Sequence, residues 1–372
     1  MAATCIHCGK SSSLISRALS LCAHCIKRHW EDVREHVASV HATGRFRFGL
    51  PAVPPRAKDG ALCRLCANGC SIPPGAVGYC GLRRREADGA VTGGVSEANV
   101  GWYYDPLPTN CVGDWVCAGG TGCGYPEFAY SPGPEHGHNN LAVFFRACSF
   151  DCLYCQNWQY RHESTRPPNA SVNDLVNAVD ANTSCICYFG GDPSPQLPYS
   201  IAASERVRRL NPGRILRICW ETNGSMNPAM LHTMASLSLE SGGCIKFDLK
   251  AWDENLHVAL CGVSNRQTIE NFGLLARMTR SRPEPPPLIA STLLVPGYVD
   301  EEEVSRIAAF IAGIDCVIPY SLLAFHPQFM MDDLPITSRI HAERCREAAL
   351  AAGLQRVHIG NVHLLLRSDY DE

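Results

Sequence analysis

The chain has 372 residues, of which 46% are hydrophobic and 19% are charged, so it can bury the core of one large domain with a smaller appendage. The formal net charge of −3 excludes a protein that is basic over its whole surface, and we expect no nucleic-acid partner. The sequence contains no run of about 20 apolar residues and no basic start followed by an apolar run. We therefore expect a cytoplasmic protein with no membrane partner.

The first predicted module, residues 1–48, carries two pairs of cysteines. Each pair has the spacing Cys-x2-Cys, and 13 residues separate the pairs, which comprise Cys5, Cys8, Cys22 and Cys25. Four thiolates at this spacing are typical of a zinc ribbon or zinc knuckle, with His7 and His24 as alternative ligands. A helix is expected over residues 23–42. The excess of positive charge in residues 1–60 is typical of a solvated small domain.

Residues 49–140 form a predicted connecting region that is rich in cysteine, glycine and proline. A Pro-rich linker over residues 50–59 precedes a second set of four thiols, Cys63, Cys66, Cys70 and Cys80. Their close spacing suits either a structural zinc ion or an auxiliary iron–sulfur centre. Residues 101–140 show no periodicity and are expected to be loops. The thiols there, Cys111, Cys117 and Cys123, either ligate a further metal or remain free.

From residue 141 to residue 372, short β runs alternate with helical stretches. Strands are expected over 141–146, 185–189, 215–221, 244–249, 288–295, 320–325 and 357–363. Helices are expected over 172–181, 199–210, 228–239, 268–280, 301–313 and 338–352. This alternation predicts an α/β fold with parallel strands joined by right-handed crossovers, in the form of a partial (β/α)6 barrel. In such barrels the loops after the strands carry the chemistry.

A cluster motif follows the first predicted strand of this barrel. Cys148, Cys152 and Cys155 have the spacing Cys-x3-Cys-x2-Cys, with the aromatic Tyr154 before the last thiol. Three thiolates can hold three irons of a [4Fe–4S] cluster and leave the fourth iron open to a ligand. The alternative is a zinc knuckle that a distant fourth ligand completes.

This motif, its aromatic residue and its place after the first strand resemble the radical S-adenosylmethionine (radical SAM) superfamily. Over residues 141–365 the chain looks most like the pyruvate formate-lyase activating enzyme-like branch, which includes the proteins named AmmeMemoRadiSam. The resemblance implies a [4Fe–4S] cluster and S-adenosylmethionine as cofactors, with reductive cleavage to a 5′-deoxyadenosyl radical that abstracts hydrogen from a substrate. It also implies an external one-electron reductant of the flavodoxin or ferredoxin kind. The substrate class stays open between a protein, a peptide and a small molecule. The segment from Cys63 to Cys80 resembles the cysteine-rich segment before the AmmeMemoRadiSam core.

Further segments at predicted strand ends support the resemblance and supply the expected site. Gly190, Gly191 and Asp192 resemble the Gly-Gly-Glu-Pro segment that binds the α-amino group of the cofactor, with Asp in place of Glu. Glu221 and Asn223, like Asp248 and Lys250, match segments near the methionine and ribose parts of the cofactor. His326 matches a histidine that faces the cofactor in activases. The resemblance thus implies catalytic roles for Lys250 and His326, and cofactor-binding roles for Tyr154, Gly190, Gly191, Asp192, Glu221, Asn223 and Asp248.

Three other functions remain open at this point. One is activation of a glycyl-radical enzyme, although such activases often carry Arg where this chain has Ser291 and often insert cysteines after the radical motif, where this chain has none. Another is an iron–sulfur electron carrier or redox sensor. The third is a binding protein built on the zinc ribbon. Most of the seven cysteines after residue 156 are expected to be small core residues.

Overall fold

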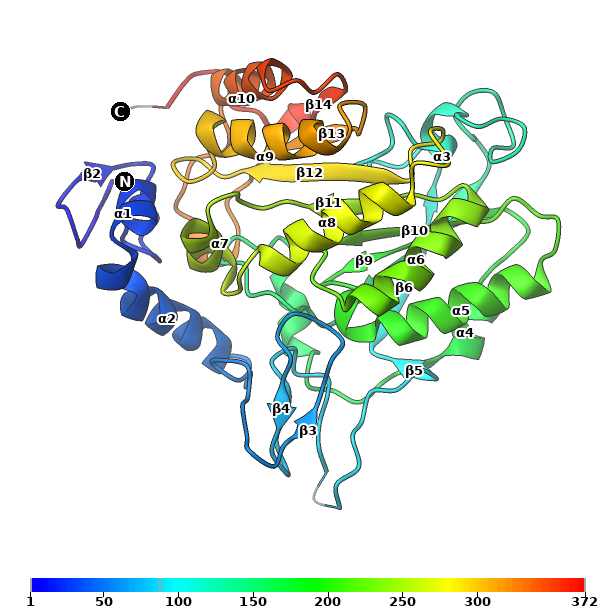
Figure 1. The fold of residues 1–372 in the computed structure, drawn as a ribbon, viewed down its shortest axis with the longest axis horizontal. Helices are drawn as coiled ribbons and strands as arrows, with labels where there is room; N and C mark the ends of the chain where they lie inside the picture. Colours follow the sequence, from blue (N-terminus) through cyan, green and yellow to red (C-terminus); the bar gives the residue numbers. More distant parts are fainter. Residues whose placement is uncertain (1, 87, 371–372) are drawn as a thin grey trace.

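The computed structural model describes residues 2–86 and 88–370 and is built around an eight-stranded sheet (Figure 1). The strand order is β14-β13-β12-β11-β10-β9-β7-β6, and every neighbouring pair is parallel except β7 with β6. The parallel strands are β7 (Asn139–Phe145), β9 (Thr183–Gly190), β10 (Arg217–Thr222), β11 (Ile245–Asp248), β12 (Leu288–Leu294), β13 (Tyr320–Ala324) and β14 (Val357–Gly360). The α/β class with a central parallel sheet is therefore confirmed.

Helices occupy the connections between these strands. They are α4 (Val172–Asn177), α5 (Leu197–Leu210), α6 (Pro228–Ser241), α7 (Glu254–Cys261), α8 (Arg266–Met278), α9 (Glu301–Ile314) and α10 (Arg339–Ala351). Local sequence explains several helix starts: Ser171 and Asp174 form a capping box before α4, and Asn227 caps α6, which begins with Pro228. Single 3₁₀ turns lie at η1 (Trp158–His162), η2 (Ser194–Gln196), η3 (Phe329–Met331) and η4 (Val362–Leu364).

Alternate residues of each strand have different surroundings, as the period of two requires. In β9, Ile186 and Tyr188 belong to the main core, where Tyr188 stacks on Trp220 of β10 with ring centroids 5.4 Å apart. Cys185 and Cys187 point the other way and line the inside of the curved sheet. The inside is therefore lined by small and polar side chains, which leaves room for cavities.

The N-terminal module lies at one side of the sheet, beside α7, and is drawn in dark blue in Figure 1. It consists of β1 (Ala3–Thr4), β2 (Ser11–Ser12), α1 (Ala23–Arg28) and α2 (Trp30–Phe46). The single helix expected over residues 23–42 is thus interrupted at His29, where the backbone leaves the helical region. Lys27 in α1 forms a 3.1 Å ion pair with Glu303 of α9, and Tyr298 donates a hydrogen bond to the carbonyl of Leu21. These contacts fix the module against the sheet domain.

The connecting region contains a strand that the sequence analysis missed. Residues 101–140 were expected to be loops, but β6 (Val100–Pro106) pairs antiparallel with β7 at the edge of the sheet. The smaller elements are β3 (Ala61–Leu62), β4 (Ser71–Ile72), β5 (Glu97–Ala98), α3 (Ala118–Thr121) and β8 (Ala170–Ser171). The Gly- and Pro-rich surroundings of β6 hide its period, and its pairing with β7 supplies the order that the local sequence does not.

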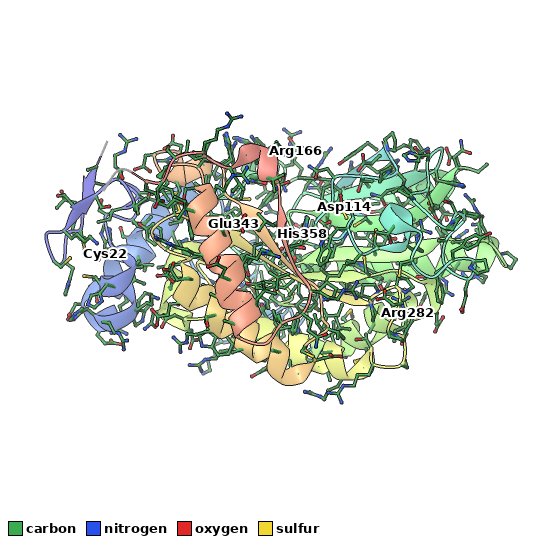
Figure 2. All side chains as sticks on the ribbon, turned by 90° about the horizontal axis from the view of Figure 1, so that it is seen from above. Cys22, Asp114, Arg166, Arg282, Glu343 and His358 are labelled. Atoms are coloured by element: carbon green, nitrogen blue, oxygen red, sulfur yellow. The ribbon has the colours of Figure 1, made fainter. Side chains whose placement is uncertain are left out.

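The segment after β6, residues 107–121, crosses from that edge of the sheet to the opposite one. Trp115 donates a 3.0 Å hydrogen bond from Nε1 to Ser321 of β13 and stacks on His358 of β14. Asp114 of this segment lies near His358 in Figure 2. The crossing segment therefore closes the open side of the partial barrel. Within the described ranges, no helix is long and apolar enough to span a membrane.

Candidate functional site

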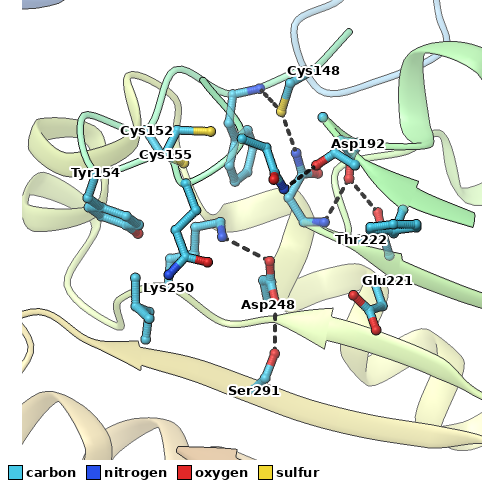
Figure 3. Close-up of a pocket in the computed structure, with 18 of the residues that line it drawn as sticks. Cys148, Cys152, Tyr154, Cys155, Asp192, Glu221, Thr222, Asp248, Lys250 and Ser291 are labelled. Carbon is cyan, nitrogen blue, oxygen red and sulfur yellow. Dashed lines mark hydrogen bonds and ion pairs between the residues drawn. The ribbon is translucent and has the colours of Figure 1, made fainter. Parts of the chain in front are cut away.

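A cavity of about 220 Å³ lies at the C-terminal ends of β9, β10, β11 and β12 (Figure 3). It brings together eleven of the residues that the sequence analysis singled out for the site: Cys148, Cys152, Tyr154, Cys155, Gly190, Gly191, Asp192, Glu221, Asn223, Asp248 and Lys250. Among the described residues His326 does not line this cavity, and its Nδ1 lies 3.1 Å from the carbonyl of Pro327. The structure thus gathers the predicted site at one sheet edge, with His326 outside it.

The loop that carries Cys148, Cys152 and Cys155 follows β7 directly. Burial raises the pKa of Cys148 well above its ordinary value and that of Cys155 to about 11. As free thiols they would be protonated at neutral pH, so binding of a soft metal must release protons. In the part of the chain that is described, the three sulfurs do not all lie within 4.8 Å of one another. One tetrahedral zinc ion needs such close sulfurs, so this spacing does not suit a single zinc ion, and three soft thiols in one loop are the kind of ligand that an iron–sulfur cluster uses.

A buried charge network centred on Asp151 holds this loop in place. Asp151 is 1% exposed, and its carboxylate contacts His41 of α2 at 2.8 Å, Arg45 of α2 at 3.4 Å, and Arg161 of η1. Burial alone would raise the pKa of Asp151, but the hydrogen bond from His41 and the charges of Arg161 and Arg45 hold it below its ordinary value. Both arginines are also buried. The N-terminal module therefore takes part directly in positioning the cysteine loop.

Gly190 and Gly191 allow the end of β9 to lie against the cysteine loop. Gly190 has a φ of +107°, a conformation that residues with a Cβ rarely adopt, and a Cβ there would lie 2.7 Å from the backbone nitrogen of Phe145. The amide of Gly191 donates to the carbonyl of Phe145 at 2.7 Å, and that of Asp192 donates to the carbonyl of Ala147 at 2.8 Å. The pair of glycines thus fixes the position of Asp192 at the wall of the cavity.

The carboxylate of Asp192 is buried and organises the strand ends around it. Its Oδ1 accepts hydrogen bonds from the Thr222 hydroxyl at 2.8 Å and the Asn223 amide at 2.9 Å, and its Oδ2 accepts one from the Ser194 amide at 2.8 Å. Burial raises the pKa of Asp192, while these donors oppose the shift. Asn223 donates to Ser149 at 2.8 Å and approaches the sulfur of Cys148 at 3.8 Å. This hydrogen-bond set ties the second and third strand ends to the cysteine loop.

Charged side chains line the opposite wall. Lys250 donates to Asp248 at 2.9 Å, and Asp248 also accepts a 2.7 Å hydrogen bond from Ser291 of β12. Burial opposes protonation of Lys250, but the charges of Asp248 and Cys152 outweigh it and raise its pKa well above the ordinary value. Glu221 pairs at 2.8 Å with Lys246, which lies deeper inside the sheet. The wall therefore offers both a fixed cation and carboxylate oxygens to a bound ligand.

The two N-terminal cysteine sets differ in their spacing. The sulfurs of Cys5, Cys8, Cys22 and Cys25 all lie within 4.8 Å of one another, with Cys8 and Cys22 3.9 Å apart. This is close to the separation of about 3.8 Å that four sulfurs at ~2.3 Å from one tetrahedral zinc ion require. His7 does not join this set but groups with His29 and Asp32 on the surface. The structure thus supports four cysteines, rather than histidines, as the ligand set.

The second set, Cys63, Cys66, Cys70 and Cys80, is not among the described groups that meet the 4.8 Å spacing. The four thiols are nevertheless close together. Burial raises the pKa of Cys66 most, and the charges of the other three cysteines raise it further. The set lies against the cysteine loop of the main cavity, because Asn68 donates a 2.7 Å hydrogen bond to the carbonyl of Ser149. Arg45 extends the connection, because it stacks 3.5 Å from the ring centre of Tyr79, the neighbour of Cys80.

Sequence reasoning missed several residues of the site. Cys261 is a buried core residue, as expected; its sulfur also lies 3.5 Å from the Tyr154 hydroxyl, and its hydrogen bond with Cys152 raises the pKa of Cys152. Thr222 was not predicted as the partner of Asp192. Ser291 was noted only because activases often carry Arg at this position, and its hydroxyl donates a hydrogen bond to Asp248. Its position at the end of β10 was the available signal for Thr222, whereas Ser291 lies in the middle of β12 and had no such signal.

The part of the chain that forms this cavity is similar in sequence to known proteins. Residues 142–311 match the model of the Radical SAM superfamily. The chain is 28% identical over 165 residues to the isethionate sulfite-lyase activating enzyme of Oleidesulfovibrio alaskensis; the match covers 42% of this chain and 48% of that protein. It is 24% identical over 194 residues to the pyruvate formate-lyase-activating enzyme of Staphylococcus aureus, over 50% of this chain and 73% of that protein. The chain thus spans about half the length of the first relative, and the matches indicate an enzyme.

Solved structures with partial similarity include a domain of the pyruvate-formate lyase-activating enzyme from Bacteroides vulgatus. It is 19% identical with a TM-score of 0.39 and covers 47% of this chain and 98% of the other. Streptococcus suis SuiB bound to S-adenosylmethionine is 14% identical with a TM-score of 0.43, over 58% of this chain and 49% of the other.

Proposed function

Since residues 142–311 form a radical SAM domain, we propose that this chain cleaves S-adenosylmethionine reductively at a [4Fe–4S] cluster and abstracts hydrogen from a substrate. The observation that carries the proposal is the convergence of three cysteines with Asp192, Asp248 and Lys250 in one cavity at the strand ends. When bound, the cluster and its cofactor supply a one-electron cleavage that yields methionine and a 5′-deoxyadenosyl radical.

The residues of the chain have separate tasks in this proposal. Cys148, Cys152 and Cys155 hold three irons, and the thiols release their protons when they do so. Asp192 presents a carboxylate already fixed by three hydrogen bonds, which suits it to bind an ammonium group of the cofactor with little further ordering. Tyr154 and the other buried aromatic residues exclude water from the loop.

The opposite wall suits the polar parts of the same ligand. Lys250 is held by Asp248 and offers donors to a carboxylate or a hydroxyl, while Glu221 and Asn223 offer an acceptor and an amide. Because His326 lies outside the cavity, we assign it no contact with the bound cofactor. These assignments make the cavity a site that orients the cofactor, and the electron comes from an external flavodoxin- or ferredoxin-like reductant.

We further propose that Cys5, Cys8, Cys22 and Cys25 hold zinc, and that Cys63, Cys66, Cys70 and Cys80 hold an auxiliary iron–sulfur cluster. The sulfurs of the first set all lie within 4.8 Å of one another, which supports one zinc ion there. The second set does not meet this spacing, which favours an iron–sulfur cluster over one zinc ion. We retain residues 1–48, 49–140 and 141–372 as the proposed division of the chain. A reducing cytoplasm is the compartment that suits 21 cysteines with metal-binding spacing.

The proposed function is tested on anaerobically purified protein with reconstituted iron. Dithionite is added as reductant, and 5′-deoxyadenosine is measured after addition of S-adenosylmethionine. Wild-type protein should form it, and the Cys152→Ala variant should not. The Cys316→Ala variant, which changes a thiol outside the cavity, is the matched control. Equal formation in wild type and Cys152→Ala would remove the proposed cluster from the reaction.

Activation of a glycyl-radical enzyme is a second candidate, because the relatives named above are activating enzymes. Against it, the crossing segment closes the open side of the barrel through the contacts of Trp115, and a protein loop would have to displace that segment. The two candidates are separated by incubation with purified pyruvate formate-lyase. An electron paramagnetic resonance (EPR) signal of a glycyl radical would support activation, and its absence with continued 5′-deoxyadenosine formation would favour another substrate.

A further inference from the structure

A second cavity, of about 340 Å³, fills the inside of the sheet below the first one. It is lined by inward-facing residues of β6, β7, β9, β10, β11 and β13 and by the crossing segment 107–121. The two cavities share a boundary, because five residues line both: Val112, Gln156, Phe189, Glu221 and Leu323. A group held in the second cavity therefore lies next to the cofactor site.

The walls of this second cavity are unusually rich in thiols. Five of them come from four segments: Cys111 and Cys117 from the crossing segment, Cys187 from β9, Cys219 from β10, and Cys244 directly before β11. Barrel interiors are normally filled by bulky branched residues such as Val, Ile and Leu. Thiols at these positions leave a space and surround it with soft ligand atoms.

The crossing segment is built to approach these strands closely. A Cβ at Gly113 would lie 2.6 Å from Cδ1 of Ile289 and 3.3 Å from Cδ of Lys246, so a larger residue there would require the Ile289 side chain to shift. Val116 packs with Cys187, Cys219 and Ile289 in one small apolar cluster. The thiols of the segment are thereby brought to the thiols of the strands.

A buried cation accompanies the thiols. The side chain of Lys246 is 3% exposed, and its Nζ donates to the sulfurs of Cys111 at 3.5 Å and Cys187 at 3.4 Å. Its one carboxylate partner is Glu221, at 2.8 Å, among the described residues. Cys219 and Cys244 form a second close pair, with sulfurs 3.9 Å apart. An ammonium group between thiols is the arrangement that stabilises negatively charged sulfur in a dry site.

From this geometry we propose that the second cavity binds an auxiliary iron–sulfur cluster through thiolates drawn from Cys111, Cys117, Cys187, Cys219 and Cys244. Where the chain is described, no three of these sulfurs form a group within 4.8 Å, so they are too widely spaced for one zinc ion, and soft thiolates are the ligands that iron–sulfur clusters use. Lys246 balances part of the negative charge of the group. The S-adenosylmethionine of the first cavity would then lie between two clusters, and the site stands whether or not the proposed function does.

The test uses the full chain in which the first cluster has been removed by the triple change Cys148→Ser, Cys152→Ser and Cys155→Ser. Iron and sulfide are measured per chain after anaerobic reconstitution, and the reduced protein is examined by EPR. Adding Cys187→Ser and Cys219→Ser should lower the iron content by roughly two to four atoms per chain, the size of one common cluster. The matched control adds Cys123→Ser and Cys316→Ser, two thiols outside both cavities, and should change nothing.

Folding is checked in the background that keeps the first three cysteines. There the Cys187→Ser and Cys219→Ser protein should retain an EPR signal that S-adenosylmethionine perturbs, which shows that its barrel is formed. If that protein does not fold, the single change Cys111→Ser on the crossing segment should alter the EPR spectrum of the triple-serine background. Unchanged iron in the first comparison, or an unchanged spectrum in the second, overturns the proposal. Failure of the proposed function alone would instead abolish the effect of S-adenosylmethionine and leave this iron in place.

Discussion

Replacing Asp151 with Asn tests whether the buried charge network holds the cysteine loop in place. The change keeps the shape of the side chain but removes the carboxylate charge that contacts Arg45, Arg161 and His41. Both arginines are 1% exposed and keep their charges in the variant. Removing one partner of a buried ion pair costs about 3–5 kcal/mol, because the remaining charge is left without compensation.

We therefore expect Asp151→Asn to lower the free energy of unfolding by about 3–5 kcal/mol, measured by urea denaturation at pH 7. The matched control is Glu240→Gln, which removes a carboxylate from an exposed pair with Arg208 and should cost about 0–1 kcal/mol. The loop that carries Cys148 should also lose iron affinity in the first variant. A change below about 1 kcal/mol for Asp151→Asn, equal to the control, would refute the reasoning.

The lowered pKa of Asp151 also predicts how this stability difference changes with pH. The folded protein lowers the pKa of Asp151, so its contribution is present above the unfolded value of about 3.9 and is lost as the pH falls through the lower folded value. The stability difference between wild type and Asp151→Asn should stay constant from pH 7 to about pH 5 and shrink below about pH 4. A difference that grows on acidification would contradict the assignment of the network.

The remaining predictions concern the metal sites and the cavity. Cys25→Ser should remove about one zinc ion per chain by elemental analysis and leave the iron content unchanged, because the two sites use separate thiols; loss of iron instead would contradict zinc at this set. Asp192→Ala should weaken binding of S-adenosylmethionine in calorimetry about tenfold or more without loss of iron, and unaltered affinity would take Asp192 out of the site. Gly190→Ala should lower iron incorporation and stability together, because its Cβ meets the backbone of Phe145; a fully loaded, stable Gly190→Ala protein would contradict the close approach of the two strand ends.

The parallel sheet could be predicted from the sequence because its signals are local. Apolar strand runs alternate with capped helices, and Pro228 at a helix start and Ser171 at another are visible without any tertiary information. The site residues at the strand ends follow from the same pattern, since parallel strands bring their C-terminal ends to one edge. Strand order and the antiparallel β6 depend on long-range pairing, and no local signal in residues 101–140 specified them.

The cavity thiols show a different limit. Cys187 and Cys219 lie in apolar runs and are buried core residues, as expected, but only the strand period together with the curvature of the sheet shows that they also line the cavity. The partner of Asp151 is His41, 110 residues away in sequence, and such a contact has no local signature. What remained hidden from the sequence was thus the packing of the N-terminal module and the crossing segment against the sheet.

The central claim, that this chain cleaves S-adenosylmethionine at the cluster of Cys148, Cys152 and Cys155, is tested most directly by 5′-deoxyadenosine formation in reduced, iron-loaded protein. The account predicts 5′-deoxyadenosine from wild type and none from Cys152→Ala, together with a wild-type EPR spectrum that changes when S-adenosylmethionine binds. An intact reduced cluster that forms no 5′-deoxyadenosine and whose spectrum does not respond to S-adenosylmethionine would contradict it.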